Sequence, residues 1–598
     1  MPEVSRPIDE LTDHDDLLAA YKTLEAEAEE STETRNREVR RNWLFYEGKQ
    51  YLDETNTPDD RVPVWKENLR ITRNICFSNI ETIRPIFQRG YPKLFISADF
   101  PEGQNPKSQL TDSQLASRMQ EIFEAEHERR GEGIEVAKLI ADVRIQGVGY
   151  RKVIYSEARN RVELPLLPFD SVLPDPFGTK ANFEDHKYVI HRTEMDVADI
   201  ERLYGVKEED FGGDDEEDPK DRFGLVRRVR RMLANGSKSV EYKRKRYTVS
   251  ELYYNEATNG AMAFNEKAKS LRFPRGRMIV VINRKLIPKQ FMKMPIPFSH
   301  GEFPIVSYHA YPLSQTFLSR GDIDQLVSPQ IAINVLYSQV IMNALLMSNA
   351  QWVVEQGAIP ERWLTNQPGL VITTKPGKMD SIRKEQAAAL PAGVFQMVKE
   401  MEEFAGEQVG ATDVVQGQSP GSGASGVVVN SLQAAAMTRH AFGMEVLDGS
   451  HRRAAKLEVS TFQDWVRFND PRLSKQRDLG EWLRFEEEMR QLLFDVDLES
   501  RSELPHNLVA RLQWGQQMLE LGVWDLTEFL DFTGIKVRES LRAKIDQLAD
   551  GFIPGVPHQE QAALRAQAGQ AQQLSQGQAS GLPGLGGGVS QDQAIPQI

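Results

Sequence analysis

A short glycine-rich segment holds the residues that come nearest to catalytic motifs. Residues 410–426 read GATDVVQGQSPGSGASG. Within it, residues 417–421 (GQSPG) match the pattern around the serine nucleophile of a hydrolase. Residues 421–426 (GSGASG) match the glycine pattern that brings backbone amides against a dinucleotide pyrophosphate. Each motif implies a particular chemistry, and each requires particular elements around it.

Neither motif has the surroundings that its chemistry needs. A nucleophilic serine sits on a tight strand-to-helix turn, but Pro420 and further loop residues separate Ser419 from the helical pattern that follows. A dinucleotide site needs a strand directly before its first glycine and a parallel strand after its helix. Here residues 416–420 intervene, and the following helical pattern is long, with no parallel strand behind it. The segment therefore predicts neither a hydrolase nor a dinucleotide-binding protein.

Other kinds of reactive site are disfavoured in the same way. The Gly-Lys pairs that end at Lys49 and Lys378 are followed by Gln and Met, so the phosphate-binding pattern GxxxxGK[ST] is missing. His440 and His451 lie on nearly the same helical face, but no HExxH pattern or ligand-spaced carboxylates surround them. The single cysteine, Cys76, excludes a disulfide framework and multi-cysteine zinc sites. We expect no catalytic residue, no metal and no cofactor, and hence no enzyme.

Composition narrows the class of protein further. The chain has 598 residues, of which 40% are apolar and 27% are charged, so it can hold two to four structural units. Its net charge of -14 argues against a protein that grips phosphates tightly. One cysteine suits a reducing cytosol, and the opening MPEVSRPIDELTDHDD lacks the apolar stretch of a signal peptide.

Helices flank the glycine-rich segment. Residues 328–354 carry no charged side chain, and Ser328 with Pro329 predicts a helix start there. Amide and hydroxyl groups recur on nearly every turn, which disfavours a membrane span and favours a helix enclosed by protein. A return helix begins near Pro391, and residues 427–468 predict one helix about 60 Å long. Its two central glycines could let that helix kink; they are Gly443 and Gly449.

Both helical and strand patterns precede these helices, so the expected fold class is α+β and helix-rich. Residues 15–51 predict an amphipathic helix with Gly48 as its natural stop, and a second helical pattern breaks near residues 85–90. Short alternating runs separated by Pro, Gly and Asp clusters predict small antiparallel sheets. A strand is expected at residues 494–498 and a tail rich in Gln, Ala, Gly and Ser from residue 554.

A charge boundary lies inside the sheet region. Residues 208–218 are strongly acidic, and clusters of arginine and lysine follow between residues 227 and 246. This pattern is typical of a solvated loop beside a charged face, and a contact surface for a partner or for phosphates stays open as the alternative. No aromatic residues interleave with the arginines, so a module that reads nucleic-acid sequence is not predicted.

The order of several segments resembles the portal proteins of tailed bacteriophages, the head-to-tail connectors. The resemblance covers roughly residues 43–545. It rests on NWLFYEGKQY, RITRNICFSNIETIRPIFQRGYP, VRIQGVGYRKVIY, LPFDSVLPDPFG, GEFPIVSYHAYPL, RGDIDQLVSPQIAINVLYSQVIMNALL, the glycine-rich segment with the SGVVVNSLQ helix start, and FDVDLESRSELPHNLVARLQWGQQML.

The resemblance implies a division of the chain into portal regions. It would have a wing of helices and small antiparallel sheets, a helical stem with a clip, a long kinked tunnel helix and a helical crown. The expected regions are an N-terminal wing (1–327), stem helices (328–354 and 385–409), clip (355–384), tunnel loop (410–426), tunnel helix (427–468), wing return (469–504), crown (505–553) and tail (554–598).

The resemblance also implies a function and candidate contact residues. The chain would form a homo-dodecameric ring at one capsid vertex of the virion, assembled in the bacterial cytoplasm and without a membrane. Its partners would be double-stranded DNA in the channel, the terminase large subunit, a head-tail adaptor, the major capsid protein and scaffolding protein. A nucleic-acid-processing enzyme and a scaffold that forms no ring are the alternatives.

The candidate contact residues lie in three regions. They are Asp413, Gln416, Gln418, Ser419, Ser422 and Ser425 in the channel loop; Asn430, Gln433, Arg439 and His440 on the channel helix; and Arg362, Trp363, Lys375, Lys378, Arg383 and Lys384 in the clip.

The chemistry of such a channel follows from its charge. A strongly basic bore would hold DNA by its phosphates and resist its movement. In residues 410–426 only Asp413 is charged, so the loop would be a pliant polar collar. The amides of residues 328–354 are expected to face the channel.

Overall fold

The computed structural model describes most of the N-terminal 500 residues and a short part of the rest. The described residues are 8, 10–52, 71–89, 94–98, 111–212, 245–255, 273, 275–348, 351–354, 382–385, 393–411, 426–466, 475–476, 482–483, 489, 492, 494–498, 508–521, 523–524, 526 and 529–530. The chain divides into two compact units, Met1–Ser500 and Arg501–Ile598.

The first unit begins with a long helix, α1 (His14–Tyr46). Asp13 caps it by accepting a hydrogen bond from the Asp15 amide at 3.1 Å. Gly48, with φ of 77°, follows its end, as the sequence predicted for this glycine. The helix buries Tyr21 and Trp43, so it contributes to the core near both of its ends.

Three helices follow in the order α2 (Ile75–Arg89), α3 (Asp112–Arg130) and α4 (Glu132–Gln146). Thr111 and Gln114 form a capping box at the start of α3, and Gly131 turns the chain into α4 in the left-handed conformation. Pro85 lies inside α2, and the helix ends at Arg89, within residues 85–90 where the sequence predicts the break.

Two small antiparallel sheets form the centre of the unit. The larger has the strand order β10-β9-β8-β7-β6, and the smaller has the order β11-β2-β5. One face of the larger sheet packs on α1 through Leu252 and Ile279, and its other face packs on Ile200 of α5 (Val197–Tyr204). The strand bounds are β2 Val148–Lys152, β5 Leu166–Leu167, β6 Val172–Pro174, β7 Tyr188–Asp196, β8 Arg246–Tyr254, β9 Arg277–Ile282, β10 Met294–Pro295 and β11 Ile305–His309.

Shorter elements complete this region. Two antiparallel pairs join β3 to β4 and β12 to β13. A third pair joins β1 (Leu94–Ala98) to β18 (Phe494–Leu498), and this confirms the strand expected at residues 494–498. The remaining bounds are β3 Ile154–Ser156, β4 Arg161–Glu163, β12 Tyr311–Leu313, β13 Thr316–Arg320 and α6 Glu208–Phe211. The charge boundary lies mostly outside the described residues.

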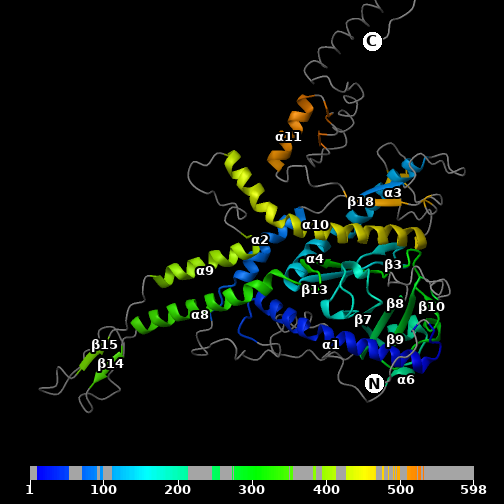
Figure 1. Cartoon of the computed structure of the whole chain (residues 1–598), viewed down its shortest axis with the longest axis horizontal. Helices are drawn as coiled ribbons and strands as arrows, with labels where there is room; N and C mark the ends of the chain where they lie inside the picture. Colours follow the sequence, from blue (N-terminus) through cyan, green and yellow to red (C-terminus); the bar gives the residue numbers. More distant parts are fainter. Residues whose placement is uncertain are drawn as a thin grey trace, which may run out of the picture. The chain divides into compact units, whose positions relative to one another are not determined.

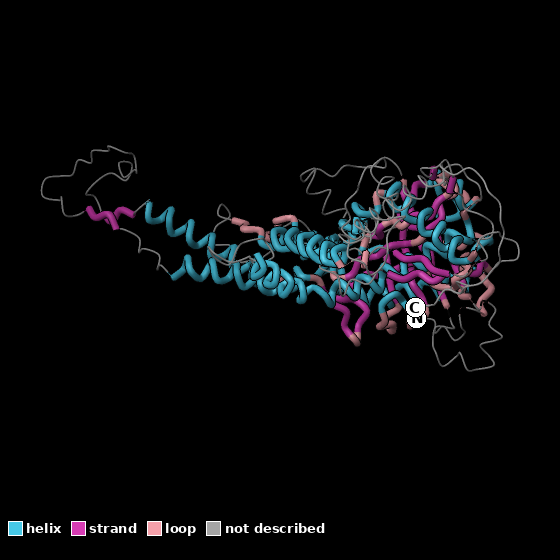
Figure 2. The backbone as a smooth tube through the Cα atoms, turned by 90° about the horizontal axis from the view of Figure 1, so that it is seen from above, coloured by secondary structure: helices cyan, strands magenta, loops and turns pink. Residues whose placement is uncertain are grey.

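Two helices, α8 (Asp322–Ser348) and α9 (Gly393–Val409), lie side by side and extend away from the sheets (Figures 1 and 2). Near their outer ends, β14 (Gln351–Val354) pairs antiparallel with β15 (Ile382–Glu385). The rest of the segment expected as a clip, residues 355–381, lies outside the described residues.

The helix expected at residues 328–354 has different ends. It begins six residues earlier, at Asp322, so Pro329 lies in its interior and not at its first position. Ile323 and Leu326 are completely buried, and their packing holds the earlier turns in the helix despite the proline. The helix ends at Ser348, because residues 351–354 pair as a strand.

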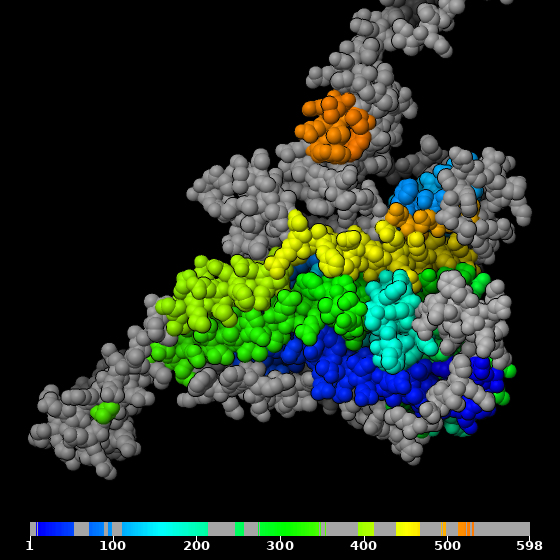
Figure 3. Space-filling model, in the orientation of Figure 1, coloured from blue at the N-terminus to red at the C-terminus, as the bar shows by residue number. Residues whose placement is uncertain are grey.

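The long helix α10 spans Gly426–Trp465, close to the range predicted from the sequence. Figure 1 shows a bend between its N-terminal part and the remainder. The remainder packs on β11 and β18. In the space-filling view it lies, in yellow, along the green and cyan parts of the unit (Figure 3). In the second unit, α11 spans Leu508–Glu520, within residues 505–553.

Candidate functional site

The helices α8, α9 and α10 meet α1, α2 and α4 in one polar junction, and the first turn of α8 anchors it. Asp324 accepts hydrogen bonds from the Arg35 guanidinium at 2.7 Å, the Asn42 amide at 2.8 Å and the Gly321 backbone at 2.8 Å. Burial raises the pKa of the Asp324 carboxyl, but the bonds from Arg35 outweigh it and the pKa is lowered. A charged carboxylate therefore ties α8 to α1.

Two amides of α8 hold the start of α2. Gln330 Oε1 accepts from the Ile75 amide at 2.9 Å, and Gln330 Nε2 donates to the Arg73 carbonyl at 2.6 Å. Asn334 Oδ1 accepts from the Arg73 amide at 3.0 Å, and its Nδ2 donates to Gln50 Oε1. Both side chains are fully buried. The expectation that the amides of this helix face a channel is therefore wrong for Gln330 and Asn334, because free backbone groups at the start of α2 need partners.

The end of α9 is held by α10. Arg439 donates from its two terminal nitrogens to the carbonyls of Glu407 at 2.5 Å and Gln408 at 2.7 Å. His440 Nε2 lies 3.3 Å from the Gly410 carbonyl, which can only accept, so this nitrogen carries the proton. Burial lowers the pKa of His440, and the neighbouring Arg144 lowers it further. The ring is therefore neutral near pH 7.

Arg144 of α4 lies at the centre of the junction and is only 2% exposed. Its guanidinium carbon stands 3.7 Å from the centre of the Phe87 ring, and Nη1 is 3.7 Å from Asp322 Oδ2. The Phe87 ring in turn meets the His440 ring edge-to-face at 5.5 Å. A single cation therefore connects α2, α4 and α8 and lies close to α10.

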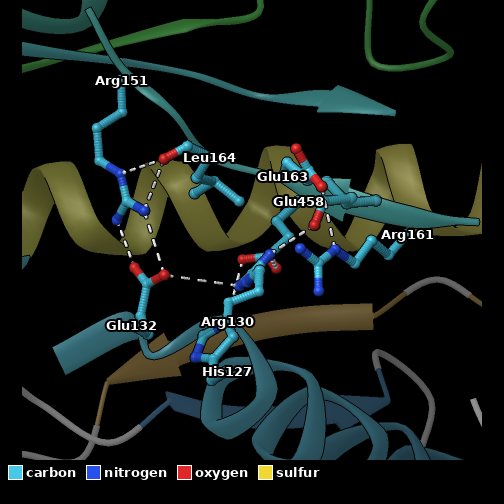
Figure 4. Close-up of polar contacts among 9 residues, drawn as sticks. His127, Arg130, Glu132, Arg151, Arg161, Glu163, Leu164 and Glu458 are labelled. Carbon is cyan, nitrogen blue, oxygen red and sulfur yellow. Dashed lines mark hydrogen bonds and ion pairs between the residues drawn. The ribbon is translucent and has the colours of Figure 1, made fainter. Parts of the chain in front are cut away.

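A second buried network fixes the C-terminal half of α10 (Figure 4). Glu458 accepts from Arg130 of α3 at 2.6 Å and lies 3.2 Å from His127 Nε2. Arg151 of β2 pairs with Glu132 of α4, which lies 3.9 Å from Arg130. Burial opposes the charge of Glu458, but Arg130 and His127 lower its pKa to about 2. This half of α10 is thus bonded directly to α3, and through Arg130 and Glu132 to α4 and β2.

The structure places only some of the residues predicted to contact DNA or partners. Arg439 and His440 lie together at the junction, where Arg439 is bonded to α9 and His440 to Gly410 directly after it. Asn430 and Gln433 belong to α10, and Arg383 and Lys384 belong to β15, but their side chains are outside the described part. The remaining candidates lie outside the described residues: Asp413, Gln416, Gln418, Ser419, Ser422, Ser425, Arg362, Trp363, Lys375 and Lys378.

Sequence reasoning missed Arg144, Gln330, Asn334 and Glu458. The polar groups of α8 did carry a signal, since an amide in an uncharged helical stretch needs a buried partner or water. Arg144 and Glu458 carried none, because charges in amphipathic helices usually face solvent.

Other kinds of site receive no support from the described residues. Among them, no group of three or more His, Cys, Asp or Glu side chains could hold a metal ion. No helix in the described part combines the length and apolar character needed to cross a bilayer.

Comparisons with known proteins identify the family of the chain. The model of the family described as "Phage P22-like portal protein" matches residues 105–466, which is more than half of the sequence. A solved structure described as "Neck of native GTA particle computed with C12 symmetry" is similar at a TM-score of 0.32 and 10% identity, covering 78% of this chain and 90% of that chain. No curated protein matches the sequence. The chain belongs to the phage P22-like portal protein family.

Proposed function

We propose that this chain assembles into a ring at one vertex of a phage capsid and that the ring is the channel through which double-stranded DNA enters and leaves. The ring would also be the platform for the terminase large subunit during packaging and for a head-tail adaptor afterwards. Membership of the portal family supports this proposal. The stoichiometry of twelve and contacts to major capsid and scaffolding proteins belong to the same proposal.

One observation on the described residues carries the ring: apolar side chains stay exposed along the helices that project from the sheets. Phe395 and Phe404 of α9 are 59% and 49% exposed, and Leu345 of α8 is 45% exposed. The exposed apolar residues also include Ile341 and Met347 of α8, Met397 of α9 and Phe442 of α10. Large apolar side chains that stay in water on projecting helices mark an interaction surface. A neighbouring copy of the same helices is the partner that a ring supplies.

The charges of the same helices fit a channel through which DNA slides. The described part of α9 carries four glutamates and one lysine, and α8 carries no basic residue. A wall of this kind makes few attractive contacts with phosphates, so it would not retain the duplex. Twelve helices of about 10 Å diameter placed side by side leave a bore of about 28 Å, which admits a B-form duplex.

The proposal assigns several regions implied by the resemblance to elements of the structure. In this proposal α8 and α9 form the stem, β14 and β15 form the base of the clip, and α10 is the tunnel helix. The clip residues Arg362, Trp363, Lys375, Lys378, Arg383 and Lys384 are proposed contacts for terminase and adaptor. Asp413, Gln416, Gln418, Ser419, Ser422 and Ser425 are proposed to line the channel, with Asn430 and Gln433 on the helix beside them.

Imaging the purified full-length chain tests the ring. Negative-stain images are expected to show an annulus with a central hole. Mass photometry is expected to show a single species with a mass close to twelve times 67.9 kDa. Monomers under assembly conditions, with no annulus, would refute the proposal. An ATPase or nuclease activity that disappears on substitution of one named residue would instead favour an enzyme.

A further inference from the structure

We propose that Arg439 and His440 form a latch that fixes the end of α9 to α10, and that they position these two helices instead of contacting DNA. The contacts that carry this inference are independent of the proposed function. Only its consequence for DNA passage rests on that function. The latch consists of the Arg439 guanidinium, the His440 ring and the carbonyls of Glu407, Gln408 and Gly410.

The last carbonyls of α9 take donors from outside the helix, and the backbone amides of Gly410 and Ala411 already donate to the carbonyls of Glu407 and Gly406. An α-helix leaves its final four carbonyls without intrahelical donors, and the helix dipole makes this end negative. Arg439 supplies two donors and a positive charge to it. The planar guanidinium reaches two adjacent carbonyls at once, a geometry that a lysine ammonium does not reproduce. Its terminal nitrogens therefore already face an acceptor within α9.

The glycine at the end of α9 makes room for the latch. Gly410 has φ of 78°, a conformation that other residues rarely adopt. A Cβ at this position would also stand 2.8 Å from His440 Cε1. The histidine ring thus packs directly against the backbone at Gly410, and its Nε2 bonds the carbonyl of the same residue.

The latch is continuous with the core of the unit. The His440 ring packs edge-to-face on Phe87, and Phe87 supports the Arg144 guanidinium. One turn further along α10, a Cβ on Gly443 would stand 2.8 Å from Arg144 Nη2. Arg144 in turn faces Asp322 at the start of α8. A shift of α10 at residues 439–443 therefore moves groups that also contact α2, α4, α8 and α9.

Hydrogen exchange on the assembled full-length protein tests the latch. In R439A, and also in R439Q, amides of residues 405–411 are expected to exchange about tenfold faster, because the end of α9 loses the two guanidinium donors and keeps only the backbone donors of Gly410 and Ala411. R439K is expected to lie between the wild type and R439A, since lysine keeps the charge but not the two-pronged geometry. R452A is the matched control, because Arg452 lies on the same helix and pairs with Asp497 at 3.1 Å.

The outcomes separate the latch from a general loosening of the protein. Unchanged exchange at residues 405–411 in R439A overturns the proposal. Equal acceleration in R452A also overturns it, because the effect would not be specific to the latch. H440Q provides a second variant at the same contact and is expected to accelerate exchange at residues 409–411 even if R439A assembles poorly.

Salt-dependent binding of a linear DNA duplex distinguishes positioning from phosphate contact. If Arg439 neutralised a phosphate, R439A would lower the slope of log affinity against log salt by about 0.9 for each phosphate that it had neutralised. The latch predicts an unchanged slope together with faster exchange. A reduced slope with unchanged exchange would assign Arg439 to DNA. If the ring neither binds nor passes DNA, the proposed function fails and the exchange result still decides the latch.

Discussion

The guanidinium of Arg144 occupies the space beside Gly443 that a side chain there would need. A Cβ on Gly443 would stand 2.8 Å from Arg144 Nη2 and 3.3 Å from Phe87 Cε1. The sequence suggested a kink at this glycine, and the structure adds a close approach between α10 and α4. Gly449, six residues along, has no atom within 4 Å of the corresponding position and is exposed.

The two glycines are therefore expected to respond oppositely to alanine. Gly443→Ala forces Arg144 or α10 to move and should destabilise the protein by about 1–3 kcal/mol. Gly449→Ala gains helix propensity without a clash and should stabilise it by up to about 1 kcal/mol. The thermal unfolding midpoint is expected to be highest for Gly449→Ala, intermediate for the wild type and lowest for Gly443→Ala. The reverse order would show that Arg144 does not constrain α10.

Removal of the Glu458 charge is expected to be costly. Glu458→Gln leaves Arg130 buried without its closest carboxylate, and breaking such a pair costs about 3–5 kcal/mol. The control is Asp495→Asn, which removes a pair with Lys456 at 3.1 Å in which both side chains are about half exposed. That change should cost about 0–1 kcal/mol. Equal losses in denaturant unfolding would mean that the buried network does not hold α10.

Acid is expected to destabilise the first unit through its buried histidines. Burial lowers the pKa of His309 to about 4, while its Nδ1 and Nε2 lie 2.9 Å and 3.0 Å from the hydroxyls of Ser319 and Ser307. The unfolded chain binds this proton below about pH 6.5 and the folded chain does not. Stability is therefore complete above pH 6.5 and is lost as the pH falls toward 4, by about 2 kcal/mol at pH 5.

A His309→Gln variant measures this contribution. Its unfolding midpoint should fall less between pH 7 and pH 5 than that of the wild type, even if its stability at pH 7 is lower. Parallel pH profiles for the two proteins would assign the acid sensitivity to other groups. His300, whose pKa burial also lowers to about 4, is the next residue to test.

Assembly is expected to depend on the exposed apolar face of α9. Phe404→Glu places a charge where a neighbouring copy would bury an apolar ring, and mass photometry should show rings replaced by monomers. Gln396→Glu adds the same charge at an exposed polar position of the same helix and should leave rings intact. Rings that persist in Phe404→Glu would place the contact between copies elsewhere.

Deletion within the glycine-rich segment should separate assembly from DNA handling. Removal of Gly417–Gly426 is expected to leave rings unchanged, while packaging or retention of DNA is impaired, because the polar collar would be lost. An in vitro packaging assay with nuclease protection measures the effect. If the deletion prevented ring formation, the segment would have a structural role instead.

The sequence by itself determined the element types where a local pattern was sufficient. The period of 3.6 residues identified the long helix at residues 427–468, and the alternating strand at residues 494–498 was located to the residue. Gly48 ends the first helix for a local reason, its left-handed conformation. The failure of the two glycine motifs was likewise a matter of neighbouring sequence. The order of segments was also enough to identify the family.

Only the tertiary structure decided which groups meet. The start of α8 depends on Ile323 and Leu326 packing in the core, and the strand at residues 351–354 depends on residues 382–385, far along the chain. The roles of Gln330 and Arg439 also depend on distant partners, the start of α2 and the end of α9. Hydrogen bonds and burial join residues that are remote in sequence, and a local pattern does not contain the identity of such a partner.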